Sequence, residues 1–124
     1  MILVVENELL LSLDISEALK GEGYNVTTVT NADDAIKVLE SRTNIRTIFT
    51  DIDLPGSMDG LKLAAAVRDR WPPVNIIVTT GMRAPGRDEM PAKSLFIAKP
   101  YRSVEVLEAL RSFDRVDEMS AKGH

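Results

Sequence analysis

Short apolar runs alternate with longer amphipathic segments along this chain. The clearest apolar runs cover residues 2–5, 47–50, 76–79 and 95–98, and most of their side chains are Val, Ile, Leu or Phe. Continuous runs of this kind are typical of strands buried on both faces, and the amphipathic segments between them are typical of helices that cover a sheet. The pattern therefore predicts repeated βα units and a parallel sheet with helices on both faces.

Apolar spacing and capping residues predict the helices between these strands. The first helix is expected to begin near Glu8 and to end by Gly21 or Gly23, and the second to begin at Asn31 as its cap. A third helix should span about 59–70 and end before a Trp-Pro-Pro sequence, because a residue that precedes proline avoids helical dihedral angles. The positions expected to face inward are Leu11, Ile15, Ala18 and Leu19 in the first helix, and Ala35, Val38 and Leu39 in the second.

The C-terminal part of the chain predicts an irregular segment followed by one regular helix. Residues 81–91 contain two prolines and two glycines, so we expect a loop with at most one helical turn there. The last helix is expected to begin with Ser103 as its cap. Its expected inward positions are Val104, Leu107 and Leu110. The folded domain is predicted to span 1–113, which leaves 114–124 as a polar, frayed tail.

Composition narrows the functional classes. The 124 residues suffice for one domain with its own core, and the absence of cysteine argues against a disulfide framework or a cysteine zinc site. A net charge of -4 and a pI near 5.0 argue against direct nucleic-acid binding. No apolar stretch approaches the roughly 20 residues that span a bilayer, and the N-terminus enters a strand without a basic, signal-like region. We therefore expect a cytoplasmic protein without membrane contact.

Four polar residues follow four of the apolar runs. Glu6, Asp51, Thr80 and Lys99 each stand at or just past the end of a predicted strand. Because ligands bind at the carboxyl edge of an open parallel sheet, these side chains are expected to converge there. Two acids, a hydroxyl and a lysine at one edge predict a site that accepts a phosphoryl group and has room for a divalent cation.

The motifs that carry this chemistry occur in a definite order. They are VVENE at 4–8, DIDLPG with a following MDG at 51–60, TG at 80–81 and FIAKP at 96–100. With these four motifs the chain, from residue 2 to about 113, resembles the receiver domain of two-component response regulators. The resemblance implies a doubly wound, flavodoxin-like α/β fold whose five parallel strands have the order 2-1-3-4-5. The irregular segment stands where such domains usually carry their fourth helix, so the partner surface there is expected to be remodelled.

The resemblance also implies roles for the acidic residues. Asp51 would be the phosphoacceptor, and Glu6, Asp51 and the backbone carbonyl of Asp53 would hold Mg2+. Receiver domains usually carry two adjacent acids where this chain has Glu6-Asn7. Asn7 offers only a neutral oxygen, so we expect it to be a weak ligand and magnesium binding to be weakened. The side chain of Asp53 either compensates by leaning toward the metal or is a solvated loop acid.

The remaining site residues are assigned from the same resemblance. Lys99 would bind the phosphoryl oxygens, and Pro100 would fix the loop behind it through a cis peptide bond. Thr80, which directly precedes Gly81, would contact the new phosphoryl group through its hydroxyl. Thr80 and Phe96 would form the switch, although Phe96 is equally consistent with a plain core aromatic.

Three functions stay open on the sequence. The first is a phosphoaccepting receiver that is not an enzyme, apart from slow self-dephosphorylation, with a sensor histidine kinase or histidine phosphotransfer protein as donor and a downstream protein as target. The second is a pseudo-receiver that binds partners without phosphorylation, for which Asn7 is the main support. The third, an aspartyl-nucleophile phosphatase of the haloacid dehalogenase type, is disfavoured because no acids follow Lys99 closely. Homodimerisation, and whether the domain acts alone or within a larger protein, are also left open.

Overall fold

Parallel strands and helices alternate along the chain in a computed structural model that describes residues 1–122, with side chains described to Arg115. The strands are β1 (Ile2–Val5), β2 (Val26–Val29), β3 (Thr47–Asp51), β4 (Asn75–Thr80) and β5 (Ser94–Ala98). The helices are α1 (Leu9–Gly21), α2 (Ala32–Ser41), α3 (Gly60–Arg70) and α4 (Ser103–Lys122), with one short 3-10 turn, η1 (Arg87–Glu89). The predicted βα units are therefore confirmed.

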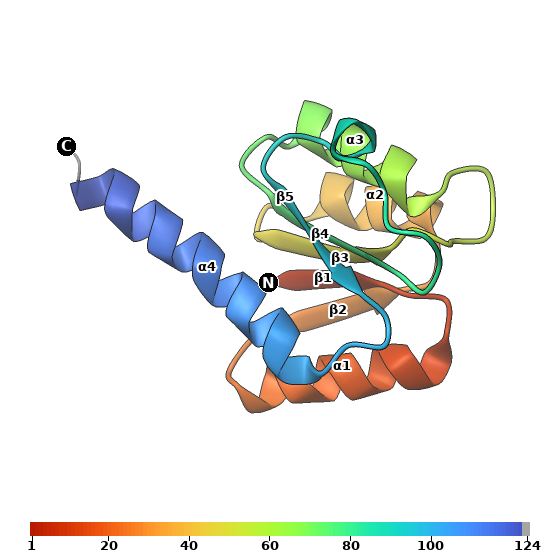
Figure 1. The fold of residues 1–124 in the computed structure, drawn as a ribbon, viewed down its shortest axis with the longest axis horizontal. Helices are drawn as coiled ribbons and strands as arrows, with labels where there is room; N and C mark the ends of the chain where they lie inside the picture. The colour runs from red at the N-terminus through yellow and green to blue at the C-terminus, as the bar shows by residue number, and fades with distance from the viewer. Residues whose placement is uncertain (123–124) are drawn as a thin grey trace.

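The sheet has the predicted strand order, β2-β1-β3-β4-β5, and all its pairings are parallel. Helices α1 and α4 cover one face, and α2 and α3 cover the other (Figure 1). Each face buries its own apolar cluster, because alternate side chains of β1, β3 and β4 point to opposite faces. The two clusters hold the strands between the helical layers, so the strand ends that carry the polar residues are fixed in place.

Local capping explains where α2 and α3 begin. The side chain of Asn31 accepts a hydrogen bond from the Asp34 amide at 2.8 Å, and the side chain of Asp59 accepts one from the Lys62 amide at 2.8 Å. Both starts were predicted. Gly60, the first residue of α3, donates its amide to the carbonyl of Ile52 at 2.8 Å, which brings the helix backbone against the end of β3.

Helix α4 differs from its prediction in phase and in length. Ser103 is its first residue rather than its cap, and Val104 is 39% exposed, while Val106 is fully buried beside Leu107 and Leu110. The predicted inward position of Val104 was therefore wrong, because packing against the sheet selects the phase of the helix. The helix continues past 113 to Lys122, and no glycine or proline interrupts 104–122; that the tail frays stays a prediction. The remaining tail residues, 123–124, lie outside the described part, and the domain boundary at 113 stays a prediction.

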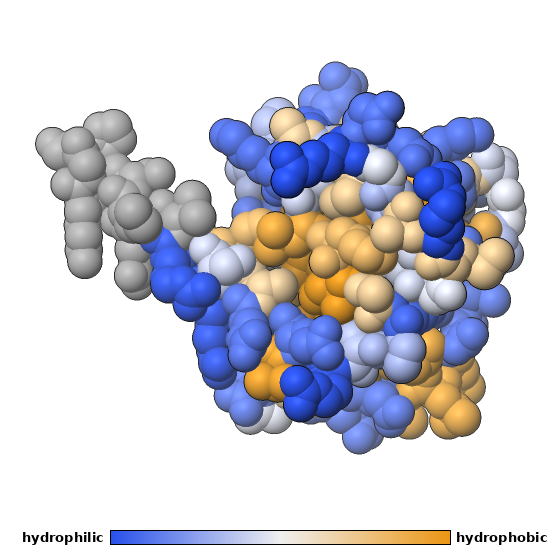
Figure 2. All heavy atoms as spheres, in the orientation of Figure 1, coloured by the Kyte–Doolittle hydropathy of each residue, from blue (hydrophilic) through white to orange (hydrophobic). Residues whose placement is uncertain are grey.

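Residues 82–92, called the 82–92 segment below, connect β4 to β5 with only the single 3-10 turn η1. The expected loop with at most one helical turn is confirmed. Met90 packs on the same apolar cluster as Phe96, and both are only half-buried. Figure 2 shows an apolar surface in the middle of this view, where β5 lies in Figure 1. A short turn thus covers this part of the sheet less completely than a longer helix would.

The far end of the 82–92 segment is tied to α3 by one side chain. The guanidinium of Arg68 donates to the carbonyls of Ala92 at 2.9 Å and Lys93 at 3.4 Å. It also donates to the carbonyls of Pro72 at 2.7 Å and Val74 at 3.1 Å. Arg68 therefore links the turn before β4 to the turn before β5.

None of the helices in the described residues combines the length and the apolar character that a membrane span requires.

Candidate functional site

The two predicted acids lie side by side at the carboxyl edge of the sheet. Val5 of β1 is in register with Thr50 of β3, so Glu6 and Asp51 occupy neighbouring positions. Their exposed fractions are only 2% and 5%. Two adjacent carboxylates cannot both remain ionised in a buried place without compensating charge and hydrogen bonds.

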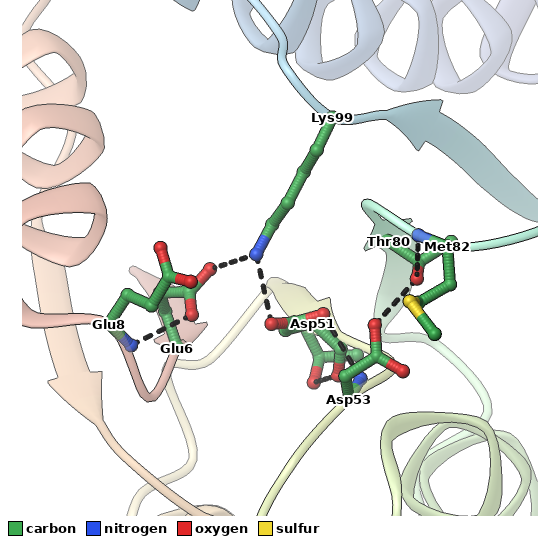
Figure 3. A network of polar contacts seen from close by, with 8 residues as sticks. Glu6, Glu8, Asp51, Asp53, Thr80, Met82 and Lys99 are labelled. Atoms are coloured by element: carbon green, nitrogen blue, oxygen red, sulfur yellow. Dashed lines mark hydrogen bonds and ion pairs between the residues drawn. The ribbon is translucent and has the colours of Figure 1, made fainter.

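Lys99 supplies that charge from the end of β5. Its Nζ lies 2.8 Å from Oε1 of Glu6 and 2.9 Å from Oδ2 of Asp51, so one ammonium bridges both carboxylates (Figure 3). The peptide bond between Lys99 and Pro100 is cis, as the resemblance implied. The structure thus brings Glu6, Asp51 and Lys99 together from three strands.

Backbone amides complete the bonding of the acids. The Glu8 amide donates to Oε2 of Glu6 at 3.0 Å, and the Asp53 amide donates to Oδ1 of Asp51 at 3.0 Å (Figure 3). These bonds hold the carboxylates in one orientation before any ligand arrives. The two carboxylates are therefore oriented by the strand ends and by the loops that follow them.

Burial and charge act on the cluster in opposite directions. Burial raises the pKa of Asp51 above its ordinary value, and the hydrogen bonds from Lys99 and the Asp53 amide only partly oppose this. Burial alone would lower the pKa of Lys99, but its hydrogen bonds to Glu6 and Asp51 outweigh this and raise it. Lys99 therefore stays charged, and the carboxyl oxygens of Glu6 and Asp51 gathered beside it are the kind of donor that a hard cation prefers.

Thr80 and Asp53 meet at the side of this cluster. The hydroxyl of Thr80 donates to Oδ2 of Asp53 at 2.6 Å, and the amide of Met82 donates to Oγ1 of Thr80 at 3.0 Å (Figure 3). Asp53 is exposed, but its carboxylate is therefore occupied by a specific partner. Neither sequence expectation for this side chain, a lean toward the metal or simple solvation, included this contact.

One open pocket joins most of the predicted site residues. It is lined by Glu6, Asn7, Glu8, Asp51, Asp53, Gly81, Met82 and Lys99. Asn7 is exposed on its rim, and Thr80 lies behind Asp53. Phe96 does not line this pocket; it packs against the apolar cluster that α2 and α3 cover.

The oxygen donors at the pocket fit magnesium. Mg2+ is held in proteins by one or two carboxylates and keeps several waters, and Glu6 and Asp51 provide two carboxylates next to backbone carbonyls. Among the described residues, no group of three or more His, Cys, Asp or Glu side chains converges on a point that could hold a metal.

Two buried hydroxyls near the site were not singled out from the sequence. Thr79 is fully buried in register with Asp51, and its hydroxyl has no hydrogen-bond partner among the described residues. The same holds for the hydroxyl of Tyr101, whose ring packs edge-on against Phe49 with centroids 5.5 Å apart. Burial, and then the charge of Glu6, raises the pKa of Tyr101 to about 12. The sequence feature that could have drawn attention to Tyr101 is its position as an aromatic residue two places after Lys99.

Known proteins match the chain over nearly its whole length. A family model described as the response regulator receiver domain matches residues 2–111. A putative NtrX-like response regulator of Rickettsia bellii is 32% identical over 64% of this chain and 17% of its own length. The transcriptional regulatory protein TcrA of Mycobacterium tuberculosis is 29% identical over 92% of this chain and 46% of its own length. The chain thus spans less than half the length of these curated relatives.

Solved structures agree with the sequence matches. A response regulator receiver protein from Sinorhizobium medicae has a TM-score of 0.84 and 28% identity, and the match covers 90% of each chain. The response regulator TrrA from Thermotoga maritima, solved in complex with Mg2+ and BeF, has a TM-score of 0.81 and 28% identity over 90% of this chain and 96% of its own. With the fold, the site geometry and the family match in agreement, the chain belongs to the response regulator receiver domains.

Proposed function

We propose that this receiver domain takes a phosphoryl group from a phosphohistidine donor onto Asp51 and signals by a change of conformation. The observation that carries the proposal is the Asp51 carboxylate itself. It is nearly buried at a strand end, oriented by the Asp53 amide and paired with Lys99, and it faces an open pocket. A structural acid at a strand end has no need of this combination.

The transfer has a simple chemical balance. An oxygen of Asp51 attacks the phosphorus, the phosphorus–nitrogen bond to the donor histidine breaks, and the imidazole nitrogen keeps the electron pair. The product is an acyl phosphate, which water later hydrolyses to restore the carboxylate. Lys99 moves from carboxylate to phosphoryl oxygens as the negative charge there grows.

Magnesium is the cofactor that the donor set supports. The side chains of Glu6 and Asp51 and the carbonyl of Asp53 would hold Mg2+, which neutralises charge on the transferring oxygens when it is bound. Asn7 lines the same pocket and would contribute a weak, neutral ligand.

The metal assignment is tested by adding one charge. Asn7→Asp should tighten Mg2+ binding by roughly tenfold, because a second acid next to Glu6 adds the hard anionic oxygen that magnesium prefers. The measurement is a Mg2+ titration followed by calorimetry, with Asn25→Asp, remote from the pocket, as the control for added net charge. Equal or weaker affinity in Asn7→Asp would show that residue 7 faces away from the metal.

Thr80 and Phe96 are proposed as the switch. The Thr80 hydroxyl turns toward the phosphoryl group, and Phe96, which is half-buried beside Met90, moves inward as Thr80 vacates its place. The 82–92 segment lies between these two residues in the chain and is the part that partners would read.

The donor is proposed to be a sensor histidine kinase or a histidine phosphotransfer protein. The first turns of α1 expose Leu9 at 79%, Leu10 at 75% and Leu13 at 49%, directly after Glu8 on the rim of the pocket. Figure 2 shows this apolar patch at the lower right, over the N-terminal end of α1. A protein that brings its phosphohistidine to Asp51 would bury these leucines.

A pseudo-receiver is the second candidate, and Asn7 favours it because a site that binds magnesium weakly transfers phosphoryl groups poorly. Incubation with acetyl phosphate and Mg2+, followed by intact mass, separates the candidates. A receiver gains one phosphoryl group, a pseudo-receiver gains none, and a phosphatase turns over phosphoesters repeatedly.

The assay needs two matched variants. Asp51→Asn should abolish incorporation and keep the fold, because an amide forms no acyl phosphate. Asp69→Asn, an exposed acid on α3, should be phosphorylated like the wild type. Full labelling of the Asp51→Asn variant would refute the assignment of the phosphoacceptor.

A further inference from the structure

The hydroxyl of Thr80 is hydrogen-bonded to Asp53 and not to the proposed phosphoacceptor, Asp51. Its proton is donated to Oδ2 of Asp53 at 2.6 Å, and its oxygen accepts the amide of Met82 at 3.0 Å. Figure 3 shows this chain of contacts beside the ion pair of Lys99 and Asp51. Thr80 itself is 2% exposed, so solvent does not compete for the hydroxyl.

A hydroxyl has one proton, and this sets up a competition. In the proposed function, Thr80 donates that proton to the phosphoryl group on Asp51. It cannot do so while it donates to Asp53. The bond to a carboxylate is charge-assisted and short, which places it among the stronger hydrogen bonds in proteins.

The acceptor is itself held in place. The backbone amide of Asp53 donates to Oδ1 of Asp51, so the residue that holds Thr80 is fixed to the phosphoacceptor through its own main chain. The carboxylate of Asp53 is exposed, and water can therefore satisfy it once Thr80 has left. The hydrogen bond is thus strong enough to keep the Thr80 hydroxyl on Asp53, and it can still break when Thr80 turns away.

We propose that Asp53 is a positioning residue that holds Thr80 in the unphosphorylated arrangement and opposes activation of the domain. This inference rests on the proposed function, because it assigns the regulation of the same site. Release of Thr80 also changes the environment of the Met82 amide, which begins the 82–92 segment. When Thr80 exchanges Asp53 for the phosphoryl group, the change is thereby passed to the 82–92 segment.

The test uses beryllofluoride with saturating Mg2+ as the probe and hydrogen exchange in the 82–92 segment as the readout. Asp53→Ala should lower the beryllofluoride concentration for half-maximal protection by roughly tenfold, because the competing acceptor is gone. Asp53→Asn, which keeps a neutral acceptor of the same shape, should lie between Asp53→Ala and the wild type. An unchanged or higher concentration in Asp53→Ala would overturn the proposal.

A double-mutant cycle separates this role from one at the metal. In a Thr80→Val background the hydroxyl is absent, so Asp53→Ala should no longer change the beryllofluoride concentration. An equal effect with and without the hydroxyl would show that Asp53 acts elsewhere and would overturn the proposal. Failure of the proposed function is seen separately, as a lack of phosphoryl incorporation from acetyl phosphate into the wild type.

Discussion

The cluster of Glu6, Asp51 and Lys99 and the 82–92 segment border the same pocket, but they are held in different ways. Glu6 and Asp51 are buried and Lys99 is half-buried, and all three are held at the ends of paired strands by ion pairs shorter than 3 Å. The segment is mostly exposed, and its ion pair between Arg83 and Glu89 is long, at 3.7 Å. Such a pair contributes little to stability.

This difference matches the two roles proposed above, chemistry at the edge of the sheet and signalling by the 82–92 segment. The sheet fixes the backbone positions of Glu6, Asp51 and Lys99, because parallel strands end at one edge and their register sets which residues are neighbours. The segment is held at fewer points: by Thr80 through the Met82 amide, by Arg68 and Ser94 through the carbonyls of Ala92 and Pro91, and by the packing of Met90 on the apolar cluster. Between these anchors it is free to reorder when the pocket changes, at little cost to the fold.

The largest expected effect comes from disturbing the rigid region at Gly60. A Cβ on this residue would overlap the carbonyl oxygen of Asp51 and lie 2.7 Å from the Cα of Ile52. Gly60→Ala should therefore lower the free energy of unfolding by about 3 kcal/mol and slow phosphorylation, since the phosphoacceptor must shift. Chemical denaturation measures the first effect. The control is Gly21→Ala, where no atom lies within 4 Å of the added methyl and no loss is expected.

The second effect comes from releasing the far anchor of the segment. Arg68→Ala removes a side chain that donates to four carbonyls, so we expect a loss of about 2 kcal/mol and faster exchange in residues 92–94. Arg70→Ala, on the same helix, loses an exposed pair with Glu40 and a cation–π contact with Trp71, 4.4 Å from the ring centroid, and should cost less. Equal losses in the two variants would show that Arg68 is not an anchor.

The third prediction concerns order in the segment itself. In the free protein the 82–92 segment should be the least protected interior segment, because few of its amides are bonded within the described residues. Beryllofluoride with Mg2+ should slow its exchange by roughly tenfold and leave β3 unchanged. Slow exchange in the free protein, or no response to beryllofluoride, would remove the contrast between the two regions.

The smallest effect is a gain in stability at Tyr101. Its buried hydroxyl has no hydrogen-bond partner among the described residues, so Tyr101→Phe should raise the free energy of unfolding at neutral pH by about 1 kcal/mol. Because the pKa of Tyr101 is raised to about 12, its un-ionised form favours the folded state fully below pH 10, and this contribution is lost as the pH rises to about 12. The variant should lose less stability over that range. A loss at neutral pH would reveal a partner for the hydroxyl.

Much of the fold and of the candidate site could be predicted from the sequence, because capping residues act locally and parallel strands end at one edge of a sheet. The caps at Asn31 and Asp59 depend only on neighbours in the chain. The meeting of Glu6, Asp51 and Lys99 follows from strands that end at one edge. The predicted inward position of Val104 in α4 was wrong, because the phase of the helix depends on which of its sides packs against the sheet. The bond between Thr80 and Asp53 could not be predicted, because it depends on the paths of two loops.

The central claim is that Asp51, and no neighbouring acid, accepts the phosphoryl group. Borohydride reduces an acyl phosphate, so it converts a phosphorylated aspartate to homoserine and leaves free carboxylates intact. After treatment with acetyl phosphate and Mg2+, the tryptic peptide 47–62 carries three candidates, namely Asp51, Asp53 and Asp59. Fragmentation of this peptide should place homoserine at residue 51 alone. Homoserine at residue 53 or 59, or an unmodified peptide, would contradict the account.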